Sequence, residues 1–395
     1  MLKTRTTYKV DLYHNIMWSK YKALVFSSLF EESRKNKRIL FNFYQIAESE
    51  GQRDGMGRID TTYHNYPYQL LYTGSYDEIG TGNLMIRLFF KVLLSNANLV
   101  LLPGYYRPEH WAMLLACLLR RKRRVVFSDS TIRDKPTRIL VNVAKRFFLF
   151  FCDAAFTYGQ RGKENLISLG IKPSNIVIRC QAAALPKNYK IESVIDGRIL
   201  KSPSSISPRF LFVGRLSDDK SIDVLLEAFA ITISKYPESS LIIVGKGHEE
   251  EKLINLAFAL GVSDHVKFLG GLDLDAIASE YQKATCLILP SRKEPWGLVV
   301  NEALHYGCPV IASDNCGCVP ELLQDSEVGM VFETDNVLNL SAAMIKAPIH
   351  FSNIKAVAKK CLDVISNNTP SMAAKQIHDG CLRVLSDTYY LRESA

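Results

Sequence analysis

The stretch CLILPSRKEPWGLVVNEAL, residues 286–304, decides the fold class of this chain, because it passes from a strand through a turn into a helix. Residues 286–289 form a short apolar run, as in a buried strand. Residues 301–304 have the pattern of a helix start. The turn between them is therefore expected at the carboxyl end of a parallel strand. Ligands of open α/β sheets bind at that edge.

Two carboxylates, Glu294 and Glu302, lie on either side of this turn. Gly297 between them lets the backbone approach a ligand closely, and N–H groups at the helix start can receive phosphate oxygens. The glutamates would then accept hydrogen bonds from the hydroxyls of a sugar and a ribose, which suits a nucleotide-sugar donor. The alternative is that both are solvated carboxylates favoured by the helix dipole.

From about residue 208, short β-prone runs alternate with amphipathic helical stretches, as in a parallel sheet flanked by helices. The predicted strands are residues 209–213, 240–244, 266–269, 286–289 and 309–312. The predicted helices are residues 221–235, 249–260, 275–283, 301–305 and 320–323. This half is predicted to be a Rossmann-like domain.

The amino-terminal half is less regular, but it also suggests a doubly wound sheet. Its candidate strands are residues 8–13, 38–43, 99–102, 125–127 and 154–157, and its candidate helices lie near residues 20–34, 83–95, 108–120 and 136–150. Proline and serine between the halves fit a linker. The predicted domains are residues 1–190 and 208–370, with a linker at 191–207 and a final helix at 371–395 that returns to the first domain.

The composition is that of a globular protein, with 47% hydrophobic and 23% charged residues in a chain of 395. This length favours two domains. The chain has no apolar run long enough to span a bilayer and no signal-peptide pattern, which predicts a cytoplasmic location. Nine cysteines without CxxC spacing predict reduced thiols. Cys316 and Cys318 lack nearby histidines, so no metal site and no cofactor are expected.

The net charge of +9 is unevenly distributed. Residues 1–190 hold 30 Lys and Arg against 14 Asp and Glu, whereas the remainder holds 19 against 26. Basic clusters at Arg120–Arg124 and Lys145-Arg146, the second followed by the aromatic run 147–151, suggest contact with an anionic membrane surface. The alternative is a solvated helix end and a buried aromatic segment. No nucleic-acid module is recognisable, so nucleic acid is not expected as a partner.

Two further turns resemble phosphate-binding turns. Gly214 follows the strand at 209–213 and permits a tight turn, and Arg215 with Lys220 would hold a diphosphate from two sides. Gly245 occupies a similar turn after the next strand. Taken separately, each is also compatible with an ordinary strand-to-helix loop. All of these turns lie at the carboxyl ends of strands in one sheet, and that convergence favours a phosphate ligand.

Residues 208–335 resemble the donor domain of the retaining group 1 glycosyltransferases, family four, which have GT-B architecture. The matching segments are FVGRLSDDKSIDVLLEAFA, LIIVGKGHEEEKL, VKFLGG, EPWGLVVNEAL and GCPVIASDNCGCVPELL. The resemblance implies an α/β fold with two Rossmann-like domains facing across a cleft. It also implies that Arg215 and Lys220 hold the donor diphosphate.

The resemblance assigns further donor contacts to the turn at 294–302. Gly297 and Leu298 would donate backbone N–H bonds to the diphosphate, and Glu302 would bind the ribose. Glu294 would hydrogen-bond the transferred sugar near the reacting carbon.

The first domain departs from the family's usual pattern in two places. The glycine-rich loop that normally follows the first strand is replaced by Asn15–Lys22, and glycines occur instead at 51–57 and 80–82. Where family members tend to carry a histidine after the strand at 125–127, this chain has Ser128-Asp129-Ser130. Asp129 would accept a hydrogen bond from a sugar hydroxyl or stabilise positive charge at the anomeric carbon. The alternative is a helix or turn cap.

The sequence therefore predicts a retaining, metal-independent glycosyltransferase at the inner face of a membrane. It would move a hexose-type sugar from a nucleoside diphosphate sugar to a glycan or lipid-linked acceptor, in cell-surface polysaccharide biosynthesis. Two alternatives stay open at this point. One is a GT-B nucleotide-sugar epimerase or phosphorylase-like enzyme, and the other is a catalytically silent nucleotide-sugar-binding subunit.

Overall fold

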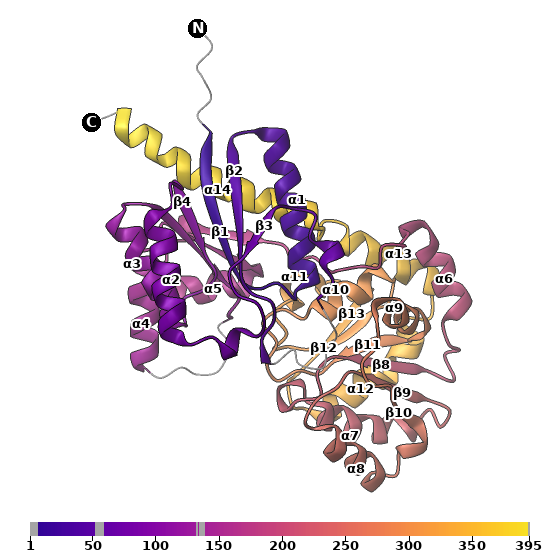
Figure 1. Cartoon of the computed structure of the whole chain (residues 1–395). Coiled ribbons are helices and arrows are strands. Elements are labelled where there is room, and N and C mark those ends of the chain that lie inside the picture. Colours follow the sequence, from indigo (N-terminus) through magenta and orange to yellow (C-terminus); the bar gives the residue numbers. More distant parts are fainter. Residues whose placement is uncertain (1–6, 52–58, 132, 134–138, 394–395) are drawn as a thin grey trace. The chain divides into compact units, whose positions relative to one another are not determined.

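The computed structural model describes residues 7–51, 59–131, 133 and 139–393. The chain divides into two compact units. The first unit contains residues 1–182 and 369–395, and the second contains residues 183–368. Each unit has one parallel sheet with helices around it (Figure 1). The predicted α/β class is therefore confirmed.

The sheet of the first unit is parallel throughout its described strands, because every neighbouring pair runs in the same direction. In spatial order the strands are β3 (Tyr68–Leu70), β2 (Ile39–Ala47), β1 (Tyr8–Ile16), β4 (Leu99–Leu102), β5 (Arg123–Ser128), β6 (Ala154–Tyr158) and β7 (Ile176–Arg179). The helices are α1 (Lys20–Asn36), α2 (Thr81–Leu94), α3 (Pro108–Leu119), α4 (Ile139–Phe150), α5 (Gly159–Ser168) and α14 (Pro370–Glu393).

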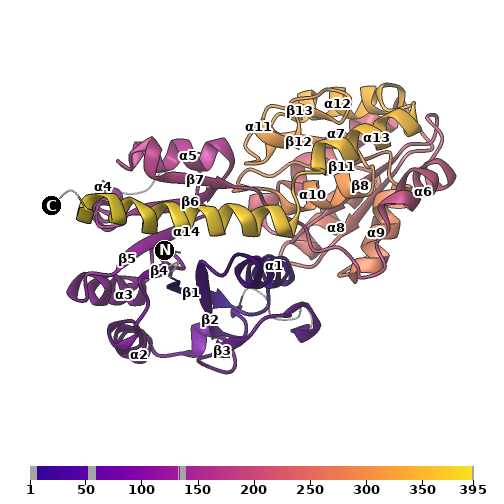
Figure 2. The same cartoon turned by 90° about the horizontal axis from the view of Figure 1, so that it is seen from above.

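The last helix, α14, belongs to the first unit, although 186 residues of the second unit separate it from the rest. It packs against α1 and β7, and Figure 2 shows it running alongside them. The side chains of Ile377, Cys381 and Leu385 are buried with those of β1 and β2 in one core cluster. Gly380 permits this approach, because a Cβ there would lie 2.5 Å from the ring of Phe156.

The sheet of the second unit is also parallel throughout its described strands. In spatial order the strands are β10 (Val266–Phe268), β9 (Ser240–Val244), β8 (Arg209–Val213), β11 (Cys286–Leu289), β12 (Val310–Ser313) and β13 (Gly329–Phe332). The helices are α6 (Val194–Lys201), α7 (Ile222–Ile233), α8 (Glu250–Ala259), α9 (Leu274–Lys283), α10 (Leu298–His305), α11 (Val319–Leu322), α12 (Val337–His350) and α13 (Ile354–Ile365).

One local prediction differs from the structure. Residues 191–207, predicted to be a linker, contain α6, whose buried Val194 and Arg198 join it to the second unit. Arg198 donates hydrogen bonds to the carbonyl oxygens of Tyr281 and Ala284, at 3.0 and 2.6 Å, and so fixes α6 against α9.

Within the described residues, no helix is both long and apolar enough to cross a membrane.

Candidate functional site

The strand order of the second unit places two loops at a single point of its sheet. The chain builds outward from β8 in one direction through β9 and β10, and in the other through β11, β12 and β13. The order therefore reverses between β8 and β11, and ligands of open α/β sheets bind outside the carboxyl ends of such strands. The loop after β8 (residues 214–221) and the loop after β11 (residues 290–297) both start at this point.

The loops after β8 and β9 are packed backbone against backbone. The N–H of Gly214 donates to the carbonyl oxygen of Val244 at 2.9 Å, and that of Leu216 donates to Lys246 at 3.0 Å. Gly245 has φ +141°, and a Cβ there would lie 1.8 Å from the carbonyl oxygen of Gly214. Gly245 is thus required to bring the two turns together, a structural role beside the predicted donor contact.

Lys220 and Glu294, predicted independently from two separate motifs, form an ion pair in the structure. The Lys220 Nζ lies 2.6 Å from a Glu294 carboxylate oxygen, and both side chains are largely buried, at 11% and 16% exposure. A charge-assisted hydrogen bond of this length fixes both side chains. The pair therefore joins the loop after β8 to the loop after β11 at the point where the strand order reverses.

Asp219 brings a second carboxylate next to the predicted cations. Its carboxylate lies 3.7 Å from Lys220 Nζ and 3.6 Å from an Arg215 guanidinium nitrogen, and it accepts a hydrogen bond from Ser217. Partial burial raises the pKa of the Asp219 carboxyl. The Ser217 hydrogen bond and the two cations together lower it by more than burial raises it, so the net pKa is below its ordinary value. Asp219 thus stays ionised and orients Arg215 and Lys220.

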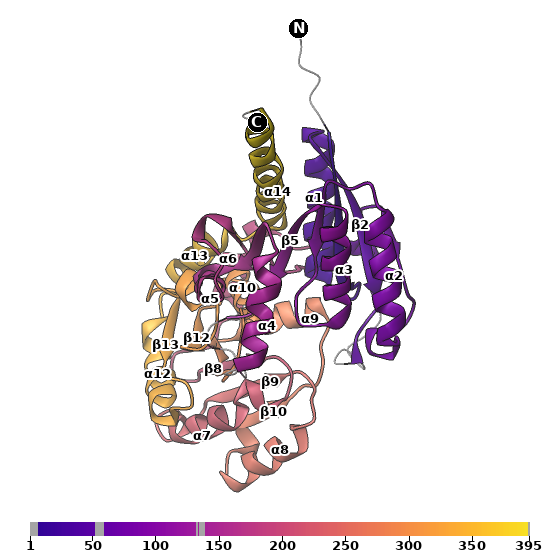
Figure 3. The same ribbon diagram turned by 90° about the vertical axis from the view of Figure 1, so that its left-hand side faces the viewer.

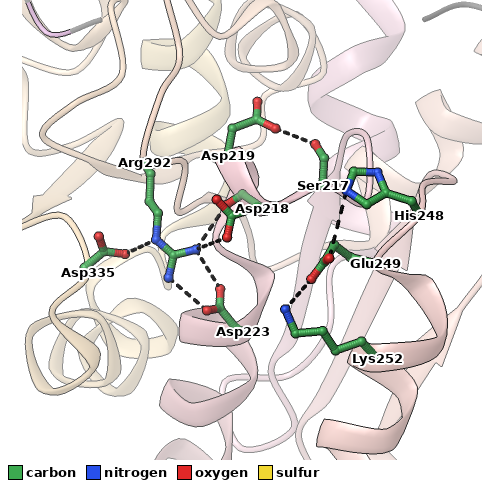
Figure 4. A network of polar contacts seen from close by, with 9 residues as sticks. All are labelled: Ser217, Asp218, Asp219, Asp223, His248, Glu249, Lys252, Arg292 and Asp335. Carbon is green, nitrogen blue, oxygen red and sulfur yellow. Dashed lines mark hydrogen bonds and ion pairs between the residues drawn. The ribbon is translucent and has the colours of Figure 1, made fainter. Parts of the chain in front are cut away.

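Arg292 holds the loop after β8 from the other side (Figure 4). Its guanidinium donates to the carbonyl oxygen of Asp218 at 3.0 Å and pairs with Asp223 at 2.8 Å and Asp335 at 2.7 Å. The pKa of Asp223 is lowered, because the hydrogen bond and charge of Arg292 outweigh its partial burial. Arg292 therefore ties three segments together around the candidate site.

The turn before α10 differs from its prediction. The helix starts at Leu298, three residues before the predicted Asn301, with Gly297 at its N-cap and φ +101°. The local reason is a hydrogen bond of 2.7 Å from the Trp296 indole to the buried Asn301 side chain, which draws residues 297–300 into the first turn. The N–H groups of Gly297 and Leu298 consequently lie at the helix start, where backbone N–H groups have no intrahelical partner.

Glu302 lies in the second turn of α10 and not at its start, so it is not the helix-start carboxylate of the alternative interpretation. The buried Tyr281 hydroxyl donates to its carboxylate at 2.9 Å. Burial raises the pKa of Glu302 to about 7, although the Tyr281 hydrogen bond lowers it in part. A half-buried carboxylate that titrates near neutral pH can accept hydrogen bonds from ribose hydroxyls in its ionised form.

Cys316 and Cys318 support the turn before α10. Both are fully buried, and Gly317 between them donates to the carbonyl oxygen of Glu294 at 2.8 Å. A Cβ at Gly317 would lie 1.9 Å from the carbonyl oxygen of Pro295. In the part of the chain that the structure describes, no group of three or more His, Cys, Asp and Glu side chains could hold a metal ion.

Asp129 belongs to the first unit, where it follows β5 directly. Its carboxylate accepts a hydrogen bond from the buried Arg179 at 2.9 Å and lies 3.8 Å from the Lys22 ammonium. Nearly half of the Asp129 side chain is exposed, at 49%. Desolvation raises its pKa, but Lys22 and Arg179 outweigh this, so the net pKa is below its ordinary value. Asp129 is thus an ionised carboxylate that Arg179 and Lys22 hold in place and that is about half exposed.

The first loop of this unit has no glycine, as the sequence indicated. β1 passes through Met17, Trp18 and Ser19 into α1. The N–H groups of Met17 and Trp18 donate to the carbonyl oxygens of Ala47, at the end of β2, and of Glu48, directly after it. Residues 51–57, one of the two alternative glycine loops, lie almost entirely outside the described residues. The other, residues 80–82, is the N-terminus of α2.

The polar contacts around the predicted site residues that sequence reasoning missed come from Asp219, Arg292, Tyr281, Lys22 and Arg179. Asp219 and Arg292 were within the quoted motifs, so their position next to Lys220 and Glu294 was a usable signal. Tyr281, Lys22 and Arg179 carried no local signal, because each contacts its partner from a distant part of the chain.

Comparisons with known proteins agree with this geometry. Residues 201–348 match the family model described as glycosyl transferases group 1. An uncharacterised glycosyltransferase of Haemophilus influenzae is 32% identical over 216 residues, which are 54% of this chain and 57% of that protein. That protein and two other curated relatives are each matched over 30% to 57% of their own length. The chain therefore spans only about half of these relatives, or less.

Two solved structures show the same fold. The lipopolysaccharide outer core galactosyltransferase WaaB, in its apo form, has a TM-score of 0.68 at 15% identity, covering 95% of this chain and 99% of that one. The Anabaena protein Alr3699/HepE in complex with UDP and glucose has a TM-score of 0.67 at 17% identity, covering 94% and 98%. The predicted GT-B type of α/β fold is thereby confirmed.

Proposed function

We propose that this chain is a glycosyltransferase, because residues 201–348 match the family model described as glycosyl transferases group 1. It would move a hexose-type sugar from a nucleoside diphosphate sugar to a glycan or lipid-linked acceptor. The observation that carries this proposal is the Lys220–Glu294 pair, which joins two loops where the strand order reverses. The UDP and glucose in the Anabaena neighbour and the lipopolysaccharide role in the name of WaaB support the proposed donor and acceptor.

In the proposed reaction the bond between the anomeric carbon and the diphosphate oxygen breaks, and negative charge develops on the leaving diphosphate. Arg215 and Lys220 stabilise that charge together with the N–H groups of Gly297 and Leu298. These donors can act without a metal ion, which is the basis for proposing metal-independent transfer. Glu302 binds the ribose.

The carboxylates of Glu294 and Asp129 have different proposed roles. Glu294, held by Lys220, accepts a hydrogen bond from the transferred sugar. Asp129, held by Arg179 and Lys22, accepts a hydrogen bond from a sugar hydroxyl or stabilises positive charge at the anomeric carbon.

We propose retention of the anomeric configuration by attack on the same face. The acceptor oxygen forms its bond to the anomeric carbon on the side that the diphosphate leaves, and the acceptor proton passes to the leaving phosphate oxygen. The roles in cell-surface polysaccharide biosynthesis and at the inner, cytoplasmic face of a membrane stay predictions.

The test is to incubate purified protein with a panel of nucleoside diphosphate sugars, with and without a lipid-linked glycan. Acceptor-dependent release of nucleoside diphosphate, with a product of the donor's anomeric configuration by NMR, is the expected result. An epimerised nucleotide sugar or phosphate-dependent cleavage would indicate the alternative enzymes. Donor binding without any turnover would indicate a silent binding subunit.

A further inference from the structure

Helix α4 exposes a row of apolar side chains on the first unit. Phe148 and Leu149 are buried and attach the helix to the core. The opposite side of the helix carries exposed residues at a spacing of three or four, and they are Ile139, Leu140, Val143, Phe147 and Phe150. Ile139 is 82% exposed and Phe150 is 80% exposed. Soluble helices usually present polar residues on such a side.

Two neighbouring helices present similar rows. On α2 the outward residues are Ile86, Phe90 and Leu94, and on α3 they are Leu115 and Leu119. Figure 3 shows α2, α3 and α4 side by side on one side of the sheet. α2 packs against α3, and Trp111 of α3 contacts the ring of Phe147 of α4. These ten outward residues of α2, α3 and α4 are named the apolar face.

The segment that builds the apolar face is strongly basic. Residues 81–150 contain 13 Lys and Arg but only 3 Asp and Glu, a net charge of +10, which exceeds the +9 of the whole chain. Three basic side chains that are exposed near the helices are Arg120, Arg121 and Arg146. Large exposed apolar areas mark interaction sites, and a basic surround favours an anionic one.

Not all of the predicted Arg120–Arg124 cluster contributes to this charge. Lys122 is buried and donates to the carbonyl oxygen of Ser95 at 2.6 Å. Arg123 and Arg124 lie in β5 and both pair with Asp153. Neutralising the whole cluster would therefore disturb the fold, whereas Arg120 and Arg121 can be changed at the surface.

We propose that the apolar face docks on an anionic lipid bilayer, with Ile139, Phe147 and Phe150 inserted at the interface and Arg120, Arg121 and Arg146 near the lipid headgroups. The combination of aromatic and aliphatic side chains with a basic surround is that of an interfacial membrane helix. A second copy of the chain would bring two basic surfaces together, which mutual repulsion opposes. The inference does not depend on the proposed glycosyl transfer.

The experiment is sedimentation of the full chain with vesicles of phosphatidylcholine, alone or mixed with phosphatidylglycerol. Phe150→Glu and Val143→Glu should each weaken binding to the anionic vesicles by at least about tenfold, because an apolar contact is lost and a repelled charge is added. The matched control is Phe258→Glu on α8, where the phenylalanine is 79% exposed in the second unit. It should bind like the wild type.

Charge is tested separately with Arg120→Gln and Arg121→Gln, each of which should weaken binding about fivefold, and added salt should weaken it further. The proposal is overturned if the wild type binds both vesicle types equally or neither. It is also overturned if Phe150→Glu weakens binding no more than Phe258→Glu. Dimerisation in lipid-free buffer that Phe150→Glu abolishes would overturn it in favour of a second copy.

Discussion

In each unit, individual side chains proposed to contact the donor or its sugar are fixed by partners of opposite charge. Lys220 holds Glu294, and Asp219 orients Lys220 and Arg215. In the first unit Arg179 and Lys22 hold Asp129. Because each of these carboxylates forms an ion pair with at least one cation, the groups proposed to contact the donor and the sugar are held in place before any substrate binds.

The first prediction concerns the proposed diphosphate contact. Lys220→Ala and Arg215→Ala should each lower kcat about a hundredfold, because each removes a donor to the charge that develops on the leaving group. The control is Lys235→Ala, an exposed lysine after α7 in the same unit. Thermal unfolding would show that the variants are folded. Wild-type kcat in Arg215→Ala, whose side chain is the more exposed, contradicts the assignment.

The second prediction concerns the pH dependence of Glu302. The pKa of this carboxyl is raised to about 7, so the group is largely protonated below that pH and ionised above it. The ionised form is an acceptor only and makes stronger, charge-assisted hydrogen bonds with ribose hydroxyls than the protonated form does. Binding of a nucleoside diphosphate sugar, measured by calorimetry, should therefore tighten as the pH rises from 6 to 8, a range that spans the Glu302 pKa of about 7.

Glu302→Gln is the matched variant, because it keeps the shape of the side chain and cannot titrate. Its affinity should be constant over the same range, and Glu302→Ala should weaken binding by roughly 1.5–3 kcal/mol at high pH. A raised pKa also means that Glu302 contributes stability below its unfolded pKa, and that this is lost as the pH rises through about 7. An unchanged pH profile in Glu302→Gln would refute this role.

At the scale of elements, the site depends on loops that approach each other more closely than side chains allow. The loop after β9 lies on the loop after β8 through Gly245, and the segment 316–318 lies on the turn 294–297 through Gly317. The strands place these loops at one edge, and the glycines let them meet.

The third prediction follows from Gly317. Gly317→Ala places a Cβ 1.9 Å from the carbonyl oxygen of Pro295, so the turn that carries Glu294 and Gly297 must move. The substitution should destabilise the protein by about 1–3 kcal/mol and weaken donor binding at least tenfold. Gly271→Ala is the control, because its nearest contact would be 3.8 Å away on a flexible lysine. Equal behaviour of the two variants in thermal unfolding and calorimetry would contradict the prediction.

At the scale of the whole molecule, the chain leaves the first unit at residue 182 and returns to it at residue 369. The core of that unit is therefore completed by a segment that follows the whole second unit in the sequence. Among the side chains of α14 that the structure describes, those of Ala373, Ala374, Ile377, Cys381 and Leu385 join the apolar cluster of this core.

The fourth prediction is that truncation after Asn368 destabilises the first unit alone. Loss of Ile377 and Leu385 from a core costs about 1.5–3 kcal/mol for each side chain, before the other contacts of α14 are counted. Hydrogen exchange should increase in α1 and β7, which α14 covers, while the second unit keeps its protection and its affinity for a nucleoside diphosphate. Equal loss of protection in both units would show that they do not unfold separately.

The strands that the sequence missed lie at sheet edges, although one edge strand, β10, was predicted. The central strands β8, β9 and β11 match their predicted bounds, because a strand buried on both faces is a continuous apolar run. The missed strands β3, β7 and β13 all lie at sheet edges, where fewer side chains are buried. Short edge strands carry little periodic signal.

What the sequence by itself determined is the fold class, the second domain and the residues of the donor motifs, because hydrophobic periodicity and turn chemistry are local properties. What only the tertiary structure decided is which charged side chains form ion pairs with each other. Lys220 and Glu294 are 74 residues apart, and Arg179 and Asp129 are 50 apart. It also decided that Lys122, Arg123 and Arg124 are engaged within the fold while the apolar face of α2, α3 and α4 stays exposed. Such pairings depend on how the strands are ordered, and no local pattern records that order.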